Sequence, residues 1–76
     1  MEENINGSNL SKREFEIMLL VSDGKLNKEI ADLLNLQFNT VRKHLQHIFP
    51  KLGVQNRTEA SMKFMKITGQ LKTVNE

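Results

Sequence analysis

The chain has 76 residues, which is enough for one small domain and leaves no room for a second. It contains no cysteine, which excludes disulfide bonds and thiolate metal sites and is typical of a reducing interior. No apolar run approaches the roughly 20 residues that span a bilayer, and the polar start at Met1 is unlike a signal peptide. We therefore expect a cytoplasmic protein without a membrane partner.

The positive charge is concentrated in one part of the chain, although the net charge is only +2. No Asp or Glu occurs between Leu33 and Thr58. The same segment carries six basic or titratable side chains: Arg42, His44, His47, Lys43, Lys51 and Arg57. On helical spacing, such a stretch presents positive charge, and phosphodiester backbones are a common partner for it. A solvated basic face without a partner is the alternative.

The start of the chain divides into a predicted tail and a predicted domain. Residues 1–9 are polar and lack periodicity, which indicates a flexible N-terminal tail before a domain over residues 10–76. Ser11 and Glu14 then form a capping-box pattern that predicts the start of a helix. This helix is expected to end at Gly24, because glycine readily adopts the left-handed conformation of a helix cap.

A second, shorter helix is predicted to follow, with Asn27 as its N-cap. It carries four apolar side chains: Ile30, Ala31, Leu33 and Leu34. Asn35 tolerates a positive φ better than most residues, so we expect it to be the pivot of the turn that comes next.

The third predicted helix has the clearest division into two faces. Its apolar positions fall at i, i+4, i+7 and i+11 and form one buried stripe: Val41, Leu45, Ile48 and Leu52. Its polar positions fall at i, i+3, i+4 and i+7 on another, outward face: Asn39, Arg42, Lys43 and Gln46. Gly53 is expected to close this helix.

A fourth helix is predicted from Arg57 to Ile67, opened by Asn56 and Glu59 as a second capping box. One face is expected to pack against the core: Ala60, Phe64 and Ile67. The opposite face is too apolar to be left in water: Thr58, Ser61, Met62 and Met65. No alternating strand pattern occurs, so the predicted fold class is all-α, with four helices and no sheet.

Five short segments, in this order and at this spacing, carry a family resemblance: Leu10-Ser11-Lys12-Arg13-Glu14, Asn27-Lys28-Glu29-Ile30-Ala31, Thr40-Val41-Arg42-Lys43-His44, Lys51-Leu52-Gly53-Val54 and Asn56-Arg57-Thr58-Glu59-Ala60. Together they resemble the LuxR-type helix-turn-helix domain. This domain is the DNA-binding unit of many bacterial response regulators and quorum sensors, and of some free-standing regulators.

The resemblance implies a four-helix domain whose third helix enters the major groove of double-stranded DNA. The family's base-contacting positions correspond to three residues of the outward face: Arg42, Lys43 and Gln46. Their side chains can donate to guanine or pair with adenine. Phosphate contacts are expected from five residues: Lys28, Asn39, Thr40, His44 and Lys51.

The fourth helix commonly forms the dimer contact in LuxR-type domains. The resemblance therefore implies a weak homodimer through its apolar face: Thr58, Ser61, Met62 and Met65. A two-fold dimer would place two recognition helices in successive major grooves, so the operator is expected to be an imperfect palindrome.

Several residues depart from the family pattern. Gln37 stands where the family has a good N-cap, so the first turn of the third helix is expected to fray or to restart with Asn39 as its cap. Phe38 replaces a residue that is usually charged; it is expected to cover apolar surface or to touch a thymine methyl group. Pro50 cannot donate to the carbonyl of Gln46, so it is predicted to interrupt the helix near its C-terminal end.

Other site chemistries are weakly supported. His44 and His47 lie three positions apart, but no cysteine or nearby carboxylate completes a zinc site, so no metal is expected. The chain also lacks catalytic constellations, so we expect neither an enzyme nor a cofactor or small-molecule substrate. Two functions remain: a sequence-specific bacterial transcription regulator, or a protein-interaction module that keeps the fold without reading DNA.

Overall fold

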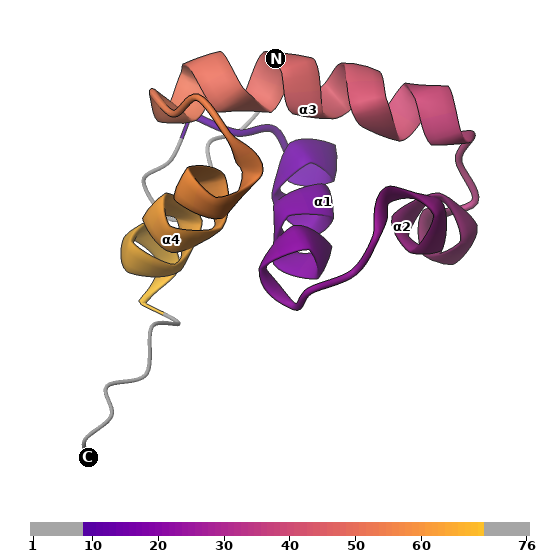
Figure 1. The fold of residues 1–76 in the computed structure, drawn as a ribbon, viewed down its shortest axis with the longest axis horizontal. Helices are drawn as coiled ribbons and strands as arrows, with labels where there is room; N and C mark the ends of the chain where they lie inside the picture. Colours follow the sequence, from indigo (N-terminus) through magenta and orange to yellow (C-terminus); the bar gives the residue numbers. More distant parts are fainter. Residues whose placement is uncertain (1–8, 70–76) are drawn as a thin grey trace.

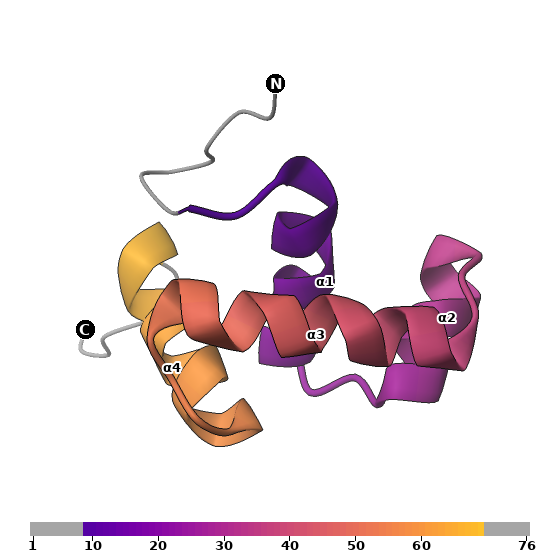
Figure 2. The same cartoon turned by 90° about the horizontal axis from the view of Figure 1, so that it is seen from above.

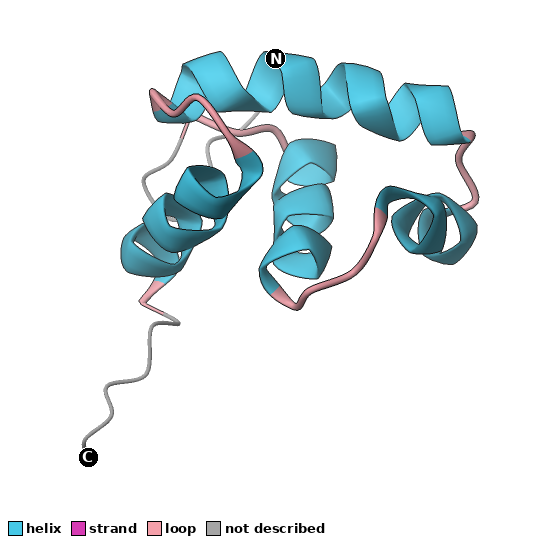
Figure 3. Ribbon diagram, viewed as in Figure 1, coloured by secondary structure: helices cyan, strands magenta, loops and turns pink. Residues whose placement is uncertain are grey.

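The computed structural model describes residues 9–69, which form four α-helices and no strand (Figure 3). The helices are α1 (Lys12–Ser22), α2 (Asn27–Leu34), α3 (Phe38–Leu52) and α4 (Arg57–Thr68). The all-α prediction is therefore confirmed. Residues 1–8 of the predicted tail and residues 70–76 of the predicted domain lie outside the described residues. Asn9, which completes the predicted tail, is exposed.

The longest helix, α3, crosses the other three helices. It runs along one side of the molecule, with α1 beneath its middle, α2 near its first residues and α4 near its last (Figures 1 and 2). Both α1 and α3 pack against every other helix, whereas the backbones of α2 and α4 do not pack against each other. One side of α3 therefore covers the core, and its other side faces away from the rest of the fold.

The first predicted capping box is present at the start of α1. The Ser11 hydroxyl accepts from the backbone N–H of Glu14 at 3.2 Å, and the Glu14 carboxylate accepts from the N–H of Ser11 at 2.9 Å. At the other end, Asp23 is the C-cap, and Gly24 has a φ of 85°, as its predicted role at the helix end requires.

The start of α2 differs from the prediction. Leu26, and not Asn27, is the N-cap residue, and the carboxylate of Glu29 accepts from its N–H at 2.7 Å. Asn27 lies inside the first turn, because its side-chain oxygen accepts from Arg57 and does not cap the helix. The turn that follows α2 is as predicted, since Asn35 has a φ of 57°.

Two predictions for α3 are wrong. The helix does not restart at Asn39: it begins at Phe38, with Gln37 as an N-cap whose side chain makes no capping hydrogen bond. Nor does Pro50 interrupt it, since α3 continues to Leu52. The missing donor of Pro50 affects the carbonyl of Gln46, an exposed residue that water can reach, and only the last turn follows.

The start of α4 confirms half of its predicted capping box. The Asn56 side chain accepts from the N–H of Glu59 at 2.9 Å. The Glu59 carboxylate accepts from the N–H of Gln55 at 3.0 Å, where the predicted box would use the N–H of Asn56. The helix ends one residue later than predicted, and Gly69 takes the left-handed C-cap conformation with a φ of 75°.

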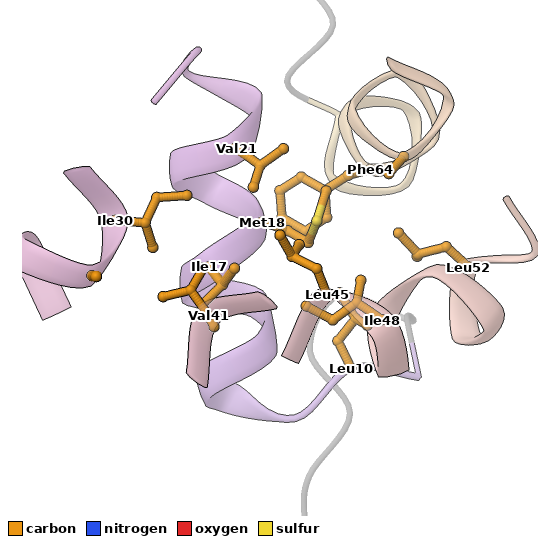
Figure 4. Close-up of a cluster of buried hydrophobic side chains, with 12 residues drawn as sticks. Leu10, Ile17, Met18, Val21, Ile30, Val41, Leu45, Ile48, Leu52 and Phe64 are labelled. Carbon is orange, nitrogen blue, oxygen red and sulfur yellow. The ribbon is translucent and has the colours of Figure 1, made fainter. Parts of the chain in front are cut away.

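All four helices contribute to a single hydrophobic core (Figure 4). The predicted stripe of α3 is buried along its whole length, as are Ala60 and Phe64 of α4. The rings of Phe15 and Phe64 pack edge to face, with centroids 5.0 Å apart. The buried apolar residues are Leu10, Ile17, Met18, Val21, Ile30, Ala31, Val41, Leu45, Ile48, Leu52, Ala60 and Phe64. Burial of the stripe fixes which side of α3 remains available to a ligand.

Candidate nucleic-acid interface

The outward face of α3 carries the four polar side chains that the sequence pattern placed there. Asn39, Arg42, Lys43 and Gln46 are all exposed. Within the described residues, none of the four forms an ion pair, and the only side-chain hydrogen bond among them joins Arg42 to the Asn39 oxygen at 3.4 Å. Their donors therefore remain available to a ligand on the side of α3 that faces away from the core.

A shallow hollow of about 260 Å³ connects this face to the start of α2. Its walls come from α2, α3 and α4: Asn27, Arg42, Leu45, Gln46, Phe49 and Arg57. Two predicted base-contacting residues, Arg42 and Gln46, thus line the same hollow as the first residue of α2. This places the N-terminal end of α2 beside the outward face of α3, where a ligand lying along α3 can reach both.

Arg57 holds the start of α2 in this place. Its guanidinium donates to the Asn27 side-chain oxygen and to the Lys25 carbonyl, both at 2.7 Å. Because the backbones of α2 and α4 do not pack against each other, the side chain of Arg57 links α4 to the start of α2. In the sequence, Arg57 belongs to the basic segment and to the Asn56–Ala60 motif, but no role had been assigned to its side chain. Its position inside the Asn56–Ala60 motif was the signal that could have identified it.

The next residue of α2, Lys28, is exposed and forms no ion pair in the described part of the chain. It lies in the first turn of α2, where free backbone N–H groups and the positive end of the helix dipole favour an anion. Lys28 is thus available to an anion, and its contact with a phosphate stays a prediction.

Thr40 and His44 occupy one flank of α3, one turn apart, and both are partly buried. Their spacing of four residues places the hydroxyl and the imidazole on the same side of the helix. That side differs from the outward face. A ligand that covers the outward face would therefore meet Thr40 and His44 only at its border.

Lys51 differs from the other expected phosphate contacts, because its ammonium group already forms an ion pair within the domain. Its ammonium lies 2.8 Å and 3.1 Å from the two carboxylate oxygens of Glu14, a residue that is only 7% exposed. This ion pair ties the C-terminal turn of α3 to the first turn of α1. A phosphate at Lys51 would have to compete with a carboxylate that has little access to water.

Two opposing effects set the pKa of the Glu14 carboxyl. Burial raises its pKa, but hydrogen bonds from Lys51 and Ser11 and the charge of Lys51 lower it. The net pKa is below the ordinary value of 4.5. Glu14 is therefore ionised at neutral pH, and it serves both as the cap of α1 and as the partner of Lys51.

The expected dimer face of α4 is only partly exposed. Thr58 and Met62 are exposed, with 58% of Met62 accessible, whereas Ser61 and Met65 are partly buried. On the other side of the helix, Ala60 and Phe64 are fully buried and Ile67 packs against the core, which confirms the predicted core face. The side chain of Met62 therefore leaves apolar surface in water.

Neither a metal centre nor a membrane span is found in the part of the chain that the structure describes. No group of three His, Cys, Asp or Glu side chains is placed to hold a metal ion. None of the four helices is long and apolar enough to cross a bilayer.

Comparison with known proteins gives a consistent family assignment. The model of the family described as "Bacterial regulatory proteins, luxR family" matches residues 8–64. The transcriptional regulatory protein LiaR of Bacillus subtilis is 45% identical over 53 residues, which cover 70% of this chain and 25% of LiaR. The response regulator protein VraR of Staphylococcus aureus is 45% identical over 51 residues, covering 67% of this chain and 24% of VraR. This chain thus spans about a quarter of the length of either relative. With its four helices arranged as a LuxR-type helix-turn-helix domain, the chain belongs to the LuxR family of bacterial regulatory proteins.

Proposed function

We propose that this chain is a sequence-specific DNA-binding transcription regulator whose helix α3 reads the major groove. The observation that carries the proposal is the exposed face of α3, where Arg42, Lys43 and Gln46 have no ion pair within residues 9–69. A major groove about 12 Å wide admits one α-helix, and these three side-chain types can form hydrogen bonds with base edges. LiaR, a transcriptional regulatory protein, and VraR, a response regulator protein, are similar to this chain, which supports this function.

General affinity would come from the residues that border the reading face. We assign phosphate contacts to Lys28 and the N-terminal turn of α2, to Asn39 at the start of α3, and to Thr40 and His44 on its flank. Lys51 is assigned differently from the sequence-based expectation. Because its ammonium is held by Glu14, its main role is to fix α3 on α1.

The experiment that tests this function is a mobility shift on mixed-sequence DNA at two salt concentrations, followed by selection of bound sites from a random pool. Neutralisation of several phosphates should make the affinity fall steeply with salt. Enrichment of a defined sequence would support specific reading. Absence of binding even at low salt would instead support a protein-interaction module that has kept the fold.

We further assign the exposed side of α4 to a weak homodimer. Met62 and Thr58 lie at its centre, with Ser61 and Met65 beside them. One pair of helices buries little area compared with stable interfaces, so the free domain should be monomeric or weakly associated. Two half-sites on the same DNA would bring two copies together and make their binding cooperative, and the operator would be an imperfect palindrome.

The dimer is tested by Met62→Glu, with Leu33→Glu as a matched control. Both side chains are apolar and almost equally exposed, 58% and 59%, but Leu33 lies on α2. Met62→Glu should leave the domain folded and abolish cooperative binding to a two-half-site operator, whereas Leu33→Glu should keep the cooperativity. Retained cooperativity in Met62→Glu would place the interface elsewhere.

A further inference from the structure

An aromatic side chain stands exposed at the first position of α3. Phe38 is 50% exposed and does not belong to the buried core. A Phe side chain stabilises a fold mainly by the apolar area that it removes from water. Half of that area is left in solvent here, so burial accounts for only part of what an aromatic ring could contribute at this position.

The position of Phe38 on α3 relates it to the reading residues. It precedes Arg42 by four residues, so the two side chains lie on the same side of the helix, one turn apart. In helix-turn-helix proteins the N-terminal residues of the recognition helix contact base edges. Phe38 occupies the first of these positions, and the first turn of α3 contains no acidic residue that would repel DNA.

The chemistry of the ring restricts what it can recognise there. A phenyl group has neither a donor nor an acceptor for the polar base edges. The C5 methyl group of thymine is the apolar group that the four natural base pairs present in the major groove, and Phe is among the residues that contact it. An aromatic ring at this point of the helix therefore favours a thymine over the other bases.

We propose that Phe38 is a specificity-determining residue that contacts the C5 methyl group of one thymine in the operator. This inference rests on the proposed DNA-binding function and adds an apolar contact to the polar contacts of Arg42, Lys43 and Gln46. The contacted thymine lies next to the base pair read by Arg42, because Phe38 is one helical turn away from Arg42.

The test replaces thymines of a selected binding site, one at a time, by deoxyuridine. Uracil keeps the hydrogen-bonding groups of thymine and lacks only the methyl group. Loss of one buried methyl contact should weaken binding of the unmodified protein about three- to fivefold at a single position. Phe38→Ala should bind the thymine and uracil sites equally at that position, and Phe38→Leu should retain part of the preference.

Leu33→Ala is the matched control, because it shortens a similarly exposed apolar side chain of α2. It should keep the full preference for thymine. The proposal is overturned if no thymine can be distinguished from uracil, or if Phe38→Ala preserves the preference. A chain that enriches no sequence from a random pool would refute the proposed function itself, whereas enrichment without methyl dependence refutes only the Phe38 contact.

Discussion

The N-terminal half and the last turn of α3 both carry positive charge, but in different surroundings. Near the beginning, Arg42 and Lys43 are exposed and form no ion pair within the described residues. Near the end, Lys51 is held by the Glu14 carboxylate at 2.8 Å. The segment between Leu33 and Thr58 contains no acidic residue, but the fold places Glu14 of α1 against its Lys51. Lys51 is also exposed, so charge and exposure do not separate it from Arg42 and Lys43; the ion pair with Glu14 does.

The sharpest way to break this comparison is to make the same substitution at both ends. Lys51→Met removes the partner of a nearly buried carboxylate and should lower the free energy of unfolding by about 1.5–3 kcal/mol. Lys43→Met should leave the free energy of unfolding within about 0.5 kcal/mol of its original value and weaken DNA binding. Urea denaturation and DNA titration measure the two effects. Equal loss of stability in both variants would show that the two ends do not differ.

A second experiment separates the proposed base contact of Arg42 from the proposed phosphate contact of Lys28. Arg42→Ala should cost about 1–3 kcal/mol on the selected site and relax the preference at one base pair. Lys28→Ala should weaken all sequences alike and reduce the salt slope by about one unit. The measurement is a titration of cognate and random DNA at several salt concentrations. If Arg42→Ala weakened cognate and random DNA equally, its assignment to a base would be wrong.

The ion pair at the other end makes stability depend on pH. Glu14 has a lower pKa when folded than when unfolded, so its contribution is present above its ordinary pKa of 4.5 and is lost as the pH falls through the lowered folded value. Glu14→Gln should therefore be less stable than the original chain near neutral pH, and the difference should shrink as the solution becomes acidic. Thermal unfolding from pH 7 down to pH 2 tests this. A difference independent of pH would mean that Glu14 acts only as a cap.

The smallest expected effect concerns Pro50, which lies in the last turn of α3 next to Lys51. Pro50→Lys restores a donor for the Gln46 carbonyl. Because only the last turn of α3 is affected, the gain should be about 1 kcal/mol, below the roughly 3 kcal/mol of a helix interior. The melting temperature should rise while the selected DNA sequence stays unchanged. A lower melting temperature would show that the native packing requires proline here.

Local sequence patterns were sufficient to predict the four helices and the two faces of α3. Spacing of apolar residues depends only on the 3.6-residue period, so the stripe from Val41 to Leu52 could be recognised without any tertiary information. The same holds for Ser11 and Glu14, whose capping bonds span three residues, and for Asn35, whose conformation is a local property. These features were predicted correctly because the interactions behind them are short-range.

The pairing of charged and polar side chains, in contrast, depends on contacts between helices that are distant in the sequence. Asn27 has the chemistry of an N-cap, but Arg57, 30 residues away, binds its side chain. The local sequence around Lys51 predicts an unpaired cation, but its ammonium forms an ion pair with Glu14, 37 residues away. Neither partner can be inferred from helical spacing, because the packing of α1, α2 and α4 around α3 brings them together. Local periodicity therefore predicts which residues of α3 lie on its surface. Long-range packing determines which of these charged side chains form ion pairs within the domain and which remain available to a ligand.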